Sequence, residues 1–382
     1  MAAWYDERLE ARARAYERSQ ALLFLLRFFL LFALAAAFWM SGWSQDLAEG
    51  LRSRFDFPLA GHLIQLIFVA VAVFGYEAIL FPLSVLADYS LEKGHGRLDQ
   101  EFGAWMRGYL VTLLLEIGIV AGSFAFLYSL MRIFPSTWWM LATGAYAVLV
   151  VGLGEWGPSQ LLPRVRPPVP SDDADLEGDL RGVGRLAGLQ VEGAAWWDFE
   201  HQEELDDVRL TGSGVRRRAV FSEWAWHQLE RGEQVFLAAR QMAAARDSAA
   251  WVVQGVQLIL AAGVFWGAAQ LAEAAAQARG LPGAAVPEAF PFLLVALFGL
   301  AAVAGVFVHA VARRMELRAD RFALRHAGGP EVLQACLKKS FERAPFGVDA
   351  PVWQILLLHR KPTARCRLEK AGLSPAPRSP GE

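Results

Sequence analysis

The chain has 382 residues, of which 55% are hydrophobic and only 20% are charged. This balance excludes a typical soluble enzyme and also a disordered protein. The 37 basic and 39 acidic residues give a net charge of -2, so there is no basic field to bind nucleic acid. Two cysteines, Cys336 and Cys366, are too few for a disulfide framework and suit a reducing compartment.

Six apolar stretches predict membrane-spanning helices, because a helix needs about 20 apolar residues to cross the hydrocarbon core. Polar segments separate these stretches into an early block of four and a later pair. The predicted spans are 21–40, 62–86, 109–131, 138–153, 251–274 and 290–312.

The order of spans and polar segments predicts four parts of the chain. A cytoplasmic N-terminal segment (1–20) precedes a four-helix membrane domain (21–155). A polar domain follows, made of 156–249 and 313–382, with two membrane helices (250–312) inserted within it. We therefore expect a mainly α membrane protein, in which a multi-span helical bundle carries a small α+β cytoplasmic domain.

Basic residues cluster at the ends that we expect to face the cytoplasm. No small-residue cleavage site follows the first span, which favours an uncleaved signal anchor. The positive-inside rule then predicts that the N-terminus, the polar domain and the C-terminal tail lie in the cytoplasm, in an inner or plasma membrane. The residues are Arg8, Arg12, Arg14 and Arg18 before the first span, and Arg313, Arg314, Arg318 and Arg321 after the last.

Three ionisable residues, Glu77, Glu116 and His309, lie within apolar stretches. Such side chains are costly in lipid, so we expect them to face the bundle interior or a wet cavity. They could line a transport path, or they could form polar contacts that hold helices together.

The polar segment between the spans contains predicted strands and helices. A proline-rich linker (158–173) leads into an amphipathic helix (172–186). Two runs that alternate apolar and polar residues flank a glycine turn in 208–226, which predicts a hairpin. A helix is expected over 227–246.

Several motifs recur in the order and at the intervals found in one family. The chain resembles the CAAX prenyl protease family, integral-membrane zinc metalloproteases of the gluzincin clan. The family's usual first span is replaced here by the charged stretch 1–20. The motifs are FPLSVLADYSLEKGHGRLDQEFGAW (81–105), FPSTWW (134–139), Pro158 with Pro163, DDVRLTGSGVRRRAVFSEWAW (206–226), MELRADRFAL (315–324) and KPTARCR (361–367).

The resemblance implies where the family's zinc site would lie. Its HExxH helix corresponds to Glu233 onward, EQVFLAARQMAA, and its ExxAD motif supplies a third zinc ligand. The positions that match the metal site are Arg240, Gln241, Ala244, Glu316 and Asp320, and those that match the substrate groove are Asp207, Lys361 and Arg367.

The side chains at the HExxH positions cannot bind zinc. Two imidazoles four residues apart would share one helix face, with a glutamate between them as the general base. Arg240 is an obligate cation, Gln241 is a neutral amide, and Ala244 has no donor. We therefore expect no cofactor, and zinc only if the site is atypical.

Side chains outside these positions offer few alternative metal sites. No two of the seven histidines are three or four residues apart, so no helical zinc pair can form. The acidic loop 198–207 around His201 could bind a divalent ion, but a solvated loop explains it better. His309 lies two helical turns before Glu316, which would allow a distorted site or a hydrogen-bonded histidine between helices.

Arg240 has a further predicted role. Without a metal, Glu316 and Asp320 would be buried and unpaired, which is costly. The guanidinium of Arg240 could form a salt bridge with both carboxylates and replace the cation that links the two helices. The alternative is an ordinary surface arginine.

These residues favour one function over two others. We expect a catalytically inactive relative that binds a polypeptide or lipidated client, or regulates a membrane partner, with membrane lipid around it and no nucleic acid. The alternative is an active zinc metalloendopeptidase with an atypical metal site. A third reading is a channel or transporter lined by Glu77 and Glu116.

Overall fold

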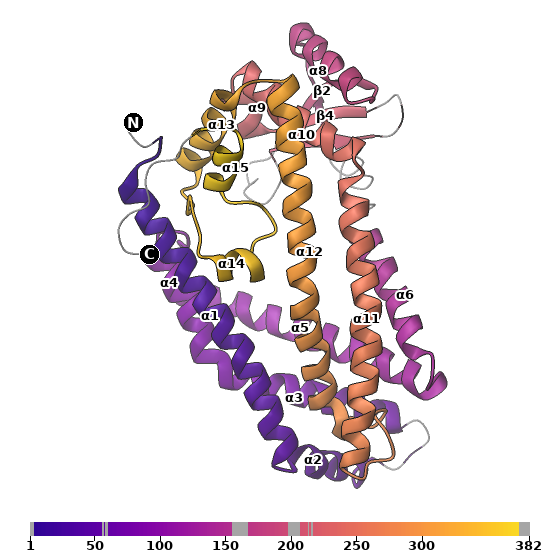
Figure 1. The fold of residues 1–382 in the computed structure, drawn as a ribbon. Coiled ribbons are helices and arrows are strands. Elements are labelled where there is room, and N and C mark those ends of the chain that lie inside the picture. The colour runs from indigo at the N-terminus through magenta and orange to yellow at the C-terminus, as the bar shows by residue number, and fades with distance from the viewer. Residues whose placement is uncertain are drawn as a thin grey trace. The chain divides into compact units, whose positions relative to one another are not determined.

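A computed structural model describes residues 4–55, 57, 60–154, 167–197, 207–212, 214 and 217–373 (Figure 1). Loop 198–206 with His201, and the linker residues Pro158 and Pro163, lie outside the described residues. The chain divides into two compact units, and each is described by itself. One comprises Tyr16–Tyr146 and Leu258–Ala304; the other comprises Met1–Ala15, Ala147–Gln257 and Gly305–Glu382.

The first unit is built from helices, and several of them continue into the other unit. Glycine at position 42, with φ of 85°, separates the first two helices. The helices are α1 (Glu7–Met40), α2 (Trp43–Arg52), α3 (Ala60–Ser84), η1 (Val85–Ser90), α4 (Leu91–Gly94), α5 (Phe102–Ile133), α6 (Trp138–Val151), α11 (Ala249–Ala278), η4 (Pro287–Ala289) and α12 (Phe290–His326).

Five helices are long and apolar enough to cross a membrane in the described part of the chain: α1, α3, α5, α11 and α12. The sixth predicted span, 138–153, corresponds to a shorter apolar helix, Trp138–Gly154, which comprises α6 and the turn that follows it in the described residues. Four of the other predicted spans lie within these helices, and 62–86 runs from α3 into η1. The protein is therefore an integral, multi-pass membrane protein.

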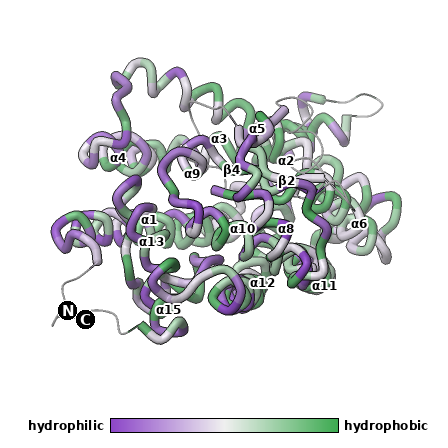
Figure 2. Tube along the Cα trace, turned by 90° about the horizontal axis from the view of Figure 1, so that it is seen from above, coloured by the Kyte–Doolittle hydropathy of each residue, from purple (hydrophilic) through white to green (hydrophobic). Residues whose placement is uncertain are grey.

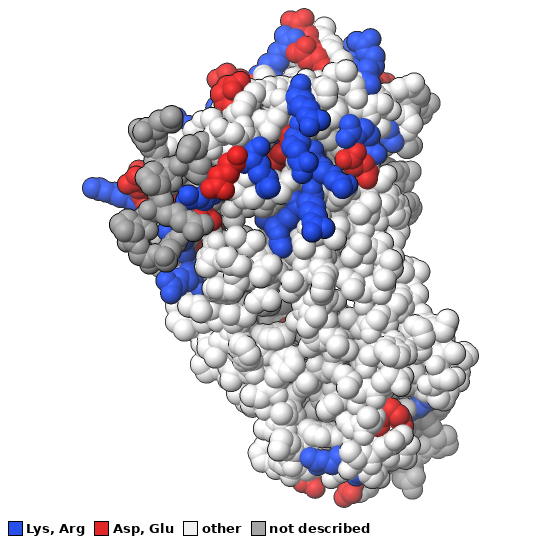
Figure 3. Space-filling view, in the orientation of Figure 1, with Lys and Arg blue, Asp and Glu red and all other residues white. Residues whose placement is uncertain are grey.

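The membrane helices expose apolar side chains along much of their length. Leu114, Ile119 and Ile259 are each more than 60% exposed. In water this would be unfavourable, but in a bilayer these side chains contact lipid. Figure 3 shows the same pattern as a wide uncharged surface, and Figure 2 shows green, hydrophobic stretches along α5 and α11.

Contacts between helices within this unit include apolar and charged side chains. Phe68 of α3 is fully buried, as are Tyr128 of α5 and Leu293 of α12. Arg52 at the end of α2 forms an ion pair with Glu288 of η4, whose side chain is buried. Helix α2 is amphipathic and was not predicted from the sequence.

The second unit contains a four-stranded sheet in the order β1-β2-β4-β3. Strand β1 pairs antiparallel with β2, β2 pairs parallel with β4, and β4 pairs antiparallel with β3. The predicted hairpin is present as β3 and β4, with Leu210 opposite Ala219. The strands are β1 (Val169–Pro170), β2 (Val191–Trp197), β3 (Val208–Thr211) and β4 (Arg217–Ser222).

Helices cover this sheet and form a common core with it. Leu180 of α8, Phe221 of β4 and Phe236 of α10 are fully buried in that core. The helices that complete the unit are α8 (Ala174–Leu186), α9 (Glu223–Gln228), α10 (Arg231–Arg246), α13 (Pro330–Arg343), α14 (Val352–Leu357) and α15 (Ala364–Lys370).

The predicted helix over 227–246 is wrong at its start. The chain forms the short helix α9 at 223–228, becomes extended at Leu229 and begins α10 at Arg231. A capping box causes the new start, because Glu230 caps the helix while the Glu233 carboxylate accepts a 2.7 Å hydrogen bond from the Glu230 backbone N–H. Likewise α8 begins after Asp173, whose side chain caps it.

Two glycines of α8 give a matched test of the core. A Cβ at Gly184 would lie 2.9 Å from Val191 Cγ2 and 3.1 Å from the Leu189 carbonyl oxygen, whereas a Cβ at Gly182 would meet nothing within 4 Å. We expect Gly184→Ala to lower the free energy of unfolding by about 1–3 kcal/mol. Gly182→Ala should raise it by up to about 1 kcal/mol, since alanine favours helix. Thermal unfolding of both variants in detergent checks this, and equal midpoints would contradict the packing.

Candidate functional site

Arg240 is held in place by the packing of α10. The buried face of this helix includes Phe236, Ala239 and Met242, which lie in the core of the sheet unit. Near its start, the Lys339 ammonium of α13 donates a 2.7 Å hydrogen bond to the buried Glu233 carboxylate. The helix is therefore fixed both by apolar packing and by a buried ion pair, and Arg240 projects from a rigid element.

The guanidinium of Arg240 binds two carboxylates on α12. Its Nε donates to Asp320 Oδ1 at 2.6 Å, and its Nη2 donates to Glu316 Oε2 at 2.7 Å. Glu316 and Asp320 are four residues apart on one helix, so both side chains lie on the same face. A single cation therefore links α10 to α12.

A second arginine completes this group. Arg367 of α15 donates from Nε to Asp320 Oδ2 at 2.8 Å and from Nη2 to Asp320 Oδ1 at 2.9 Å, a bidentate pair. Thr363 caps α15 and so fixes the direction from which Arg367 approaches. We call Arg240, Glu316, Asp320 and Arg367 the ion cluster; its two arginines balance its two carboxylates.

The ion cluster is largely shielded from water. The side chain of Asp320 is 4% exposed, those of Arg367 and Arg240 are 14% and 17% exposed, and that of Glu316 is 35% exposed. Burial alone would lower the pKa of Arg240, but the charges of Asp320 and Glu316 outweigh it and raise that pKa above its ordinary value. Arg240 is therefore a permanent cation in this site.

The structure brings together some of the predicted site residues and separates others. Gln241 and Ala244 lie on α10 and are half-buried. Asp207 precedes β3 and accepts a 3.0 Å hydrogen bond from Arg343 of α13, so it is not part of the ion cluster. Lys361 is exposed and precedes the cap of α15. Arg367, which the resemblance matches to the substrate groove, binds Asp320.

The remaining candidates do not join the ion cluster. The Nδ1 atom of His309 on α12 is buried with no hydrogen-bond partner among the described residues. Glu77 is half-buried on α3, and Glu116 is exposed on α5. The proposed ligand His201 lies outside the described residues.

The residues at this site do not fit the zinc ion that the resemblance implies. Helix α10 presents a guanidinium and a methyl group at the two positions where imidazole donors are required, and an amide at the position of the general base. Glu316 and Asp320 are already bound by arginine nitrogens. Within the described ranges, no group of three or more His, Cys, Asp or Glu side chains is placed to hold a metal ion.

The buried thiol of Cys336 is also a poor ligand. Burial, together with the charge of Glu233, raises the pKa of Cys336 on α13 to about 12, so its thiolate is scarce at neutral pH. We expect maleimide at pH 7.5 to label Cys366, which is half-buried, far faster than Cys336 in the folded protein. Mass spectrometry of labelled peptides measures this, and rapid labelling of Cys336 would contradict its burial.

The bidentate pair of Arg367 with Asp320 was missed at the sequence level. Its signal was present, because Arg367 and Asp320 belong to two motifs that the family combines. Sequence spacing alone does not show that α15 and α12 meet.

Comparison with known proteins supports the resemblance. Residues 1–163 match the family model described as the N-terminal region of CAAX prenyl proteases, with five membrane helices. The crystal structure of Ste24p from S. mikatae has a TM-score of 0.72 and 13% sequence identity to the chain. That match covers 96% of this chain and 90% of Ste24p, so the fold is shared along nearly the whole length. No curated protein matches the chain. The first 163 residues are thus similar to the N-terminal region of CAAX prenyl proteases, and the chain as a whole shares the fold of Ste24p.

Proposed function

We propose that this protein is a catalytically inactive member of the CAAX prenyl protease family and that it binds a polypeptide or lipidated client without cleaving it. The observation that supports this is the Arg240 guanidinium, which lies 2.7 Å from Glu316 and 2.6 Å from Asp320. A cation that cannot activate water takes the role of linking α10 to α12. The scaffold is thus kept while the hydrolytic chemistry is lost.

The catalytic groups that are missing from this site support an inactive protein. Removal of a general base costs about 10²- to 10⁴-fold in rate, and Gln241 stands at that position. A metal at such a site would act as the Lewis acid that polarises the scissile carbonyl. No side chain of the ion cluster supplies either function, because both of its carboxylates are held by arginines.

Strand β3 is the place where we expect a client peptide to bind. It lies at the edge of the sheet, with β4 on one side and no strand on its other side in the described part of the chain. The backbone groups of an edge strand can pair with an extended peptide, which adds as a further strand. Arg209 and Leu210 of β3 are half-buried, so the edge also offers side-chain contacts.

The same proposal includes an orientation. We infer that the N-terminus, the sheet unit and the tail face the cytoplasm, because Arg8 and Arg12 precede the first span and Arg313 and Arg314 follow the last. In cells where a fused phosphatase is active only outside the cytoplasm, a C-terminal phosphatase fusion should be inactive. A C-terminal fluorescent fusion in the same cells should fluoresce. An active phosphatase would overturn this orientation.

A cleavage and binding assay tests the function. Full-length protein in detergent is incubated with an unmodified peptide and with the same peptide carrying a lipid on cysteine. We expect at least one peptide to bind and neither to be hydrolysed. A photoreactive residue in place of Arg209 should cross-link to the bound peptide, whereas one in place of Arg185 of α8 should not. Hydrolysis that a chelator abolishes would establish the alternative, an active metalloendopeptidase. Absence of binding to either peptide would contradict the client role.

A further inference from the structure

Basic side chains gather around a pocket at the C-terminal end of α12. The pocket has a volume of about 440 Å³, and four arginines from two separate helices line it. We call it the arginine pocket, and its lining residues are Arg246, Asp247, Arg318, Arg321, Phe322, Arg325 and His326.

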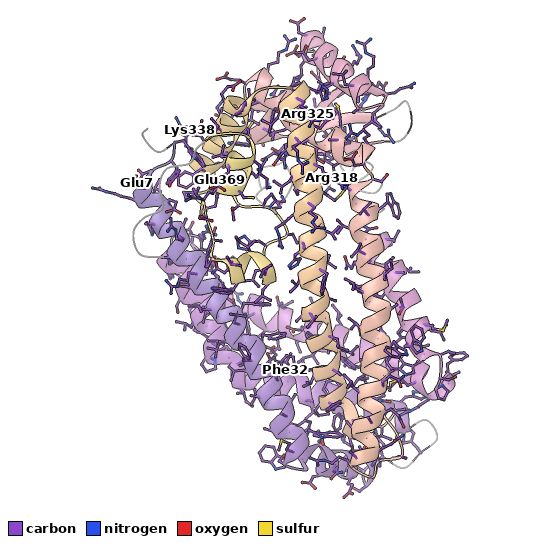
Figure 4. All side chains as sticks on the ribbon, in the orientation of Figure 1. Glu7, Phe32, Arg318, Arg325, Lys338 and Glu369 are labelled. Atoms are coloured by element: carbon purple, nitrogen blue, oxygen red, sulfur yellow. The ribbon has the colours of Figure 1, made fainter. Side chains whose placement is uncertain are left out.

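Helix geometry brings these arginines together. Arg318, Arg321 and Arg325 are spaced three and four residues apart, so they lie on one face of α12. Arg246 arrives from the last turn of α10, and its guanidinium stacks over the ring of Phe322 at 4.8 Å from the ring centre. Figure 4 shows Arg318 and Arg325 on this part of α12, and Figure 3 shows a column of blue atoms over it.

The described residues do not balance the charges in this pocket. The one carboxylate is Asp247, which accepts a 2.8 Å hydrogen bond from Arg246 Nε. Among the residues that the structure describes, Arg318, Arg321 and Arg325 form no ion pair, and Arg318 donates a weak hydrogen bond to the Met315 sulfur at 3.8 Å. Four arginines against one carboxylate leave three positive charges uncompensated. Clustered like charges repel, so an anion bound here would be strongly favoured.

The position along the chain places the pocket at the membrane surface. Helix α12 is apolar up to Ala312, and Arg318 follows six residues later, about 9 Å along the helix axis. The headgroup layer extends about 5–7 Å beyond the hydrocarbon core on each side, and an arginine side chain can reach back toward it. On the other helix, Arg246 precedes the exposed Trp251 by five residues, and tryptophan is typical of the membrane interface.

The positive-inside rule accounts for arginines after a span, but it does not account for this arrangement. Orientation depends on the number of basic residues near the span, whichever way they point. Here residues from two segments about 70 positions apart converge on one pocket with an aromatic floor. Such convergence is typical of a binding site for a phosphate group, since guanidinium groups bind phosphate in a bidentate manner.

We propose that the arginine pocket binds the headgroup phosphate of an anionic phospholipid from the adjoining leaflet. The phosphate accepts hydrogen bonds from Arg318, Arg321 and Arg246, while the acyl chains remain in the bilayer beside the apolar part of α12. This site is independent of the ion cluster and of a client, because it uses none of those residues.

Lipid retention on the full-length protein tests this site. Native mass spectrometry compares dioleoyl phosphatidylglycerol with dioleoyl phosphatidylcholine, for the natural chain and for the variant R318Q/R321Q/R325Q. Each surface arginine contributes about 1 kcal/mol to binding an anionic membrane, so three changes predict up to about 100-fold weaker binding of phosphatidylglycerol. Binding of phosphatidylcholine should be unchanged.

Two further variants serve as controls. R54Q/R107Q/R185Q removes three exposed arginines outside the pocket and should retain phosphatidylglycerol as the natural chain does. R318K/R321K/R325K keeps the charge and should bind phosphatidylglycerol within about tenfold of the natural chain. It therefore distinguishes a loss of charge from a folding defect. Equal retention by the glutamine variant and the natural chain would overturn the site. If pyrophosphate at equal concentration displaces the lipid, the occupant of the pocket is a soluble anion and the lipid proposal is overturned.

Discussion

Replacement of Arg240 with methionine is expected to destabilise the sheet unit by about 3 kcal/mol. The change leaves Glu316 with no partner in the ion cluster and removes one of the two partners of Asp320, whose side chain is 4% exposed. Removal of one partner from a buried pair costs about 3–5 kcal/mol, and we take the lower end because Arg367 still binds Asp320. In thermal unfolding this corresponds to a fall in midpoint of about 6 °C.

The control for this change lies on the same helix. Arg231 of α10 is exposed and pairs with Asp179 of α8 at 2.7 Å. Because solvent screens exposed pairs, Arg231→Met should leave the midpoint almost unchanged. Equal midpoints for Arg240→Met and the natural chain would show that the carboxylates do not depend on this arginine.

A second variant should restore a metal site. Arg240→His, Gln241→Glu and Ala244→His together place two imidazoles four residues apart on α10, facing Glu316 of α12. Because Arg240 already lies within hydrogen-bond range of Glu316, the two helices are close enough for one ion to replace it. We expect this triple variant to bind about one zinc per chain, and the natural chain to bind far less than one.

A matched variant isolates the imidazoles. Arg240→Ala with Gln241→Glu and Ala244→His removes the guanidinium but supplies only one histidine, so it should bind zinc much more weakly. Metal analysis by inductively coupled plasma mass spectrometry measures all three proteins. If the triple variant folds with a cooperative thermal transition and still binds no zinc, α10 and α12 do not have the geometry of a zinc site.

The sequence predicted those parts of the fold that depend on local pattern. Apolar length alone located the helices that contain 62–86 and 109–131, and alternation around a glycine turn located β3 and β4. The link from Arg240 to Glu316 and Asp320 was predicted because the motif alignment placed three charges at one site. These predictions required only short-range spacing or a known arrangement of motifs.

Other features depend on contacts that spacing does not reveal. Strand β2 contains Gly193, Ala194 and Ala195, a run with little β propensity, and it is a strand because it pairs on both sides with β1 and β4. The start of α10 was missed because the capping box of Glu230 and Glu233 outweighs the helix propensity of the residues before it. The arginine pocket was missed because Arg246 and Arg325 are far apart in sequence.

The measurement that tests the central claim most directly is an anomalous diffraction map, recorded at the zinc absorption edge, of crystals grown from protein expressed in zinc-rich medium. Our account predicts no anomalous peak between α10 and Glu316, and continuous density for the Arg240 guanidinium between Glu316 and Asp320. A peak at that position, with protein nitrogen or oxygen donors around it and Arg240 turned away, would contradict it.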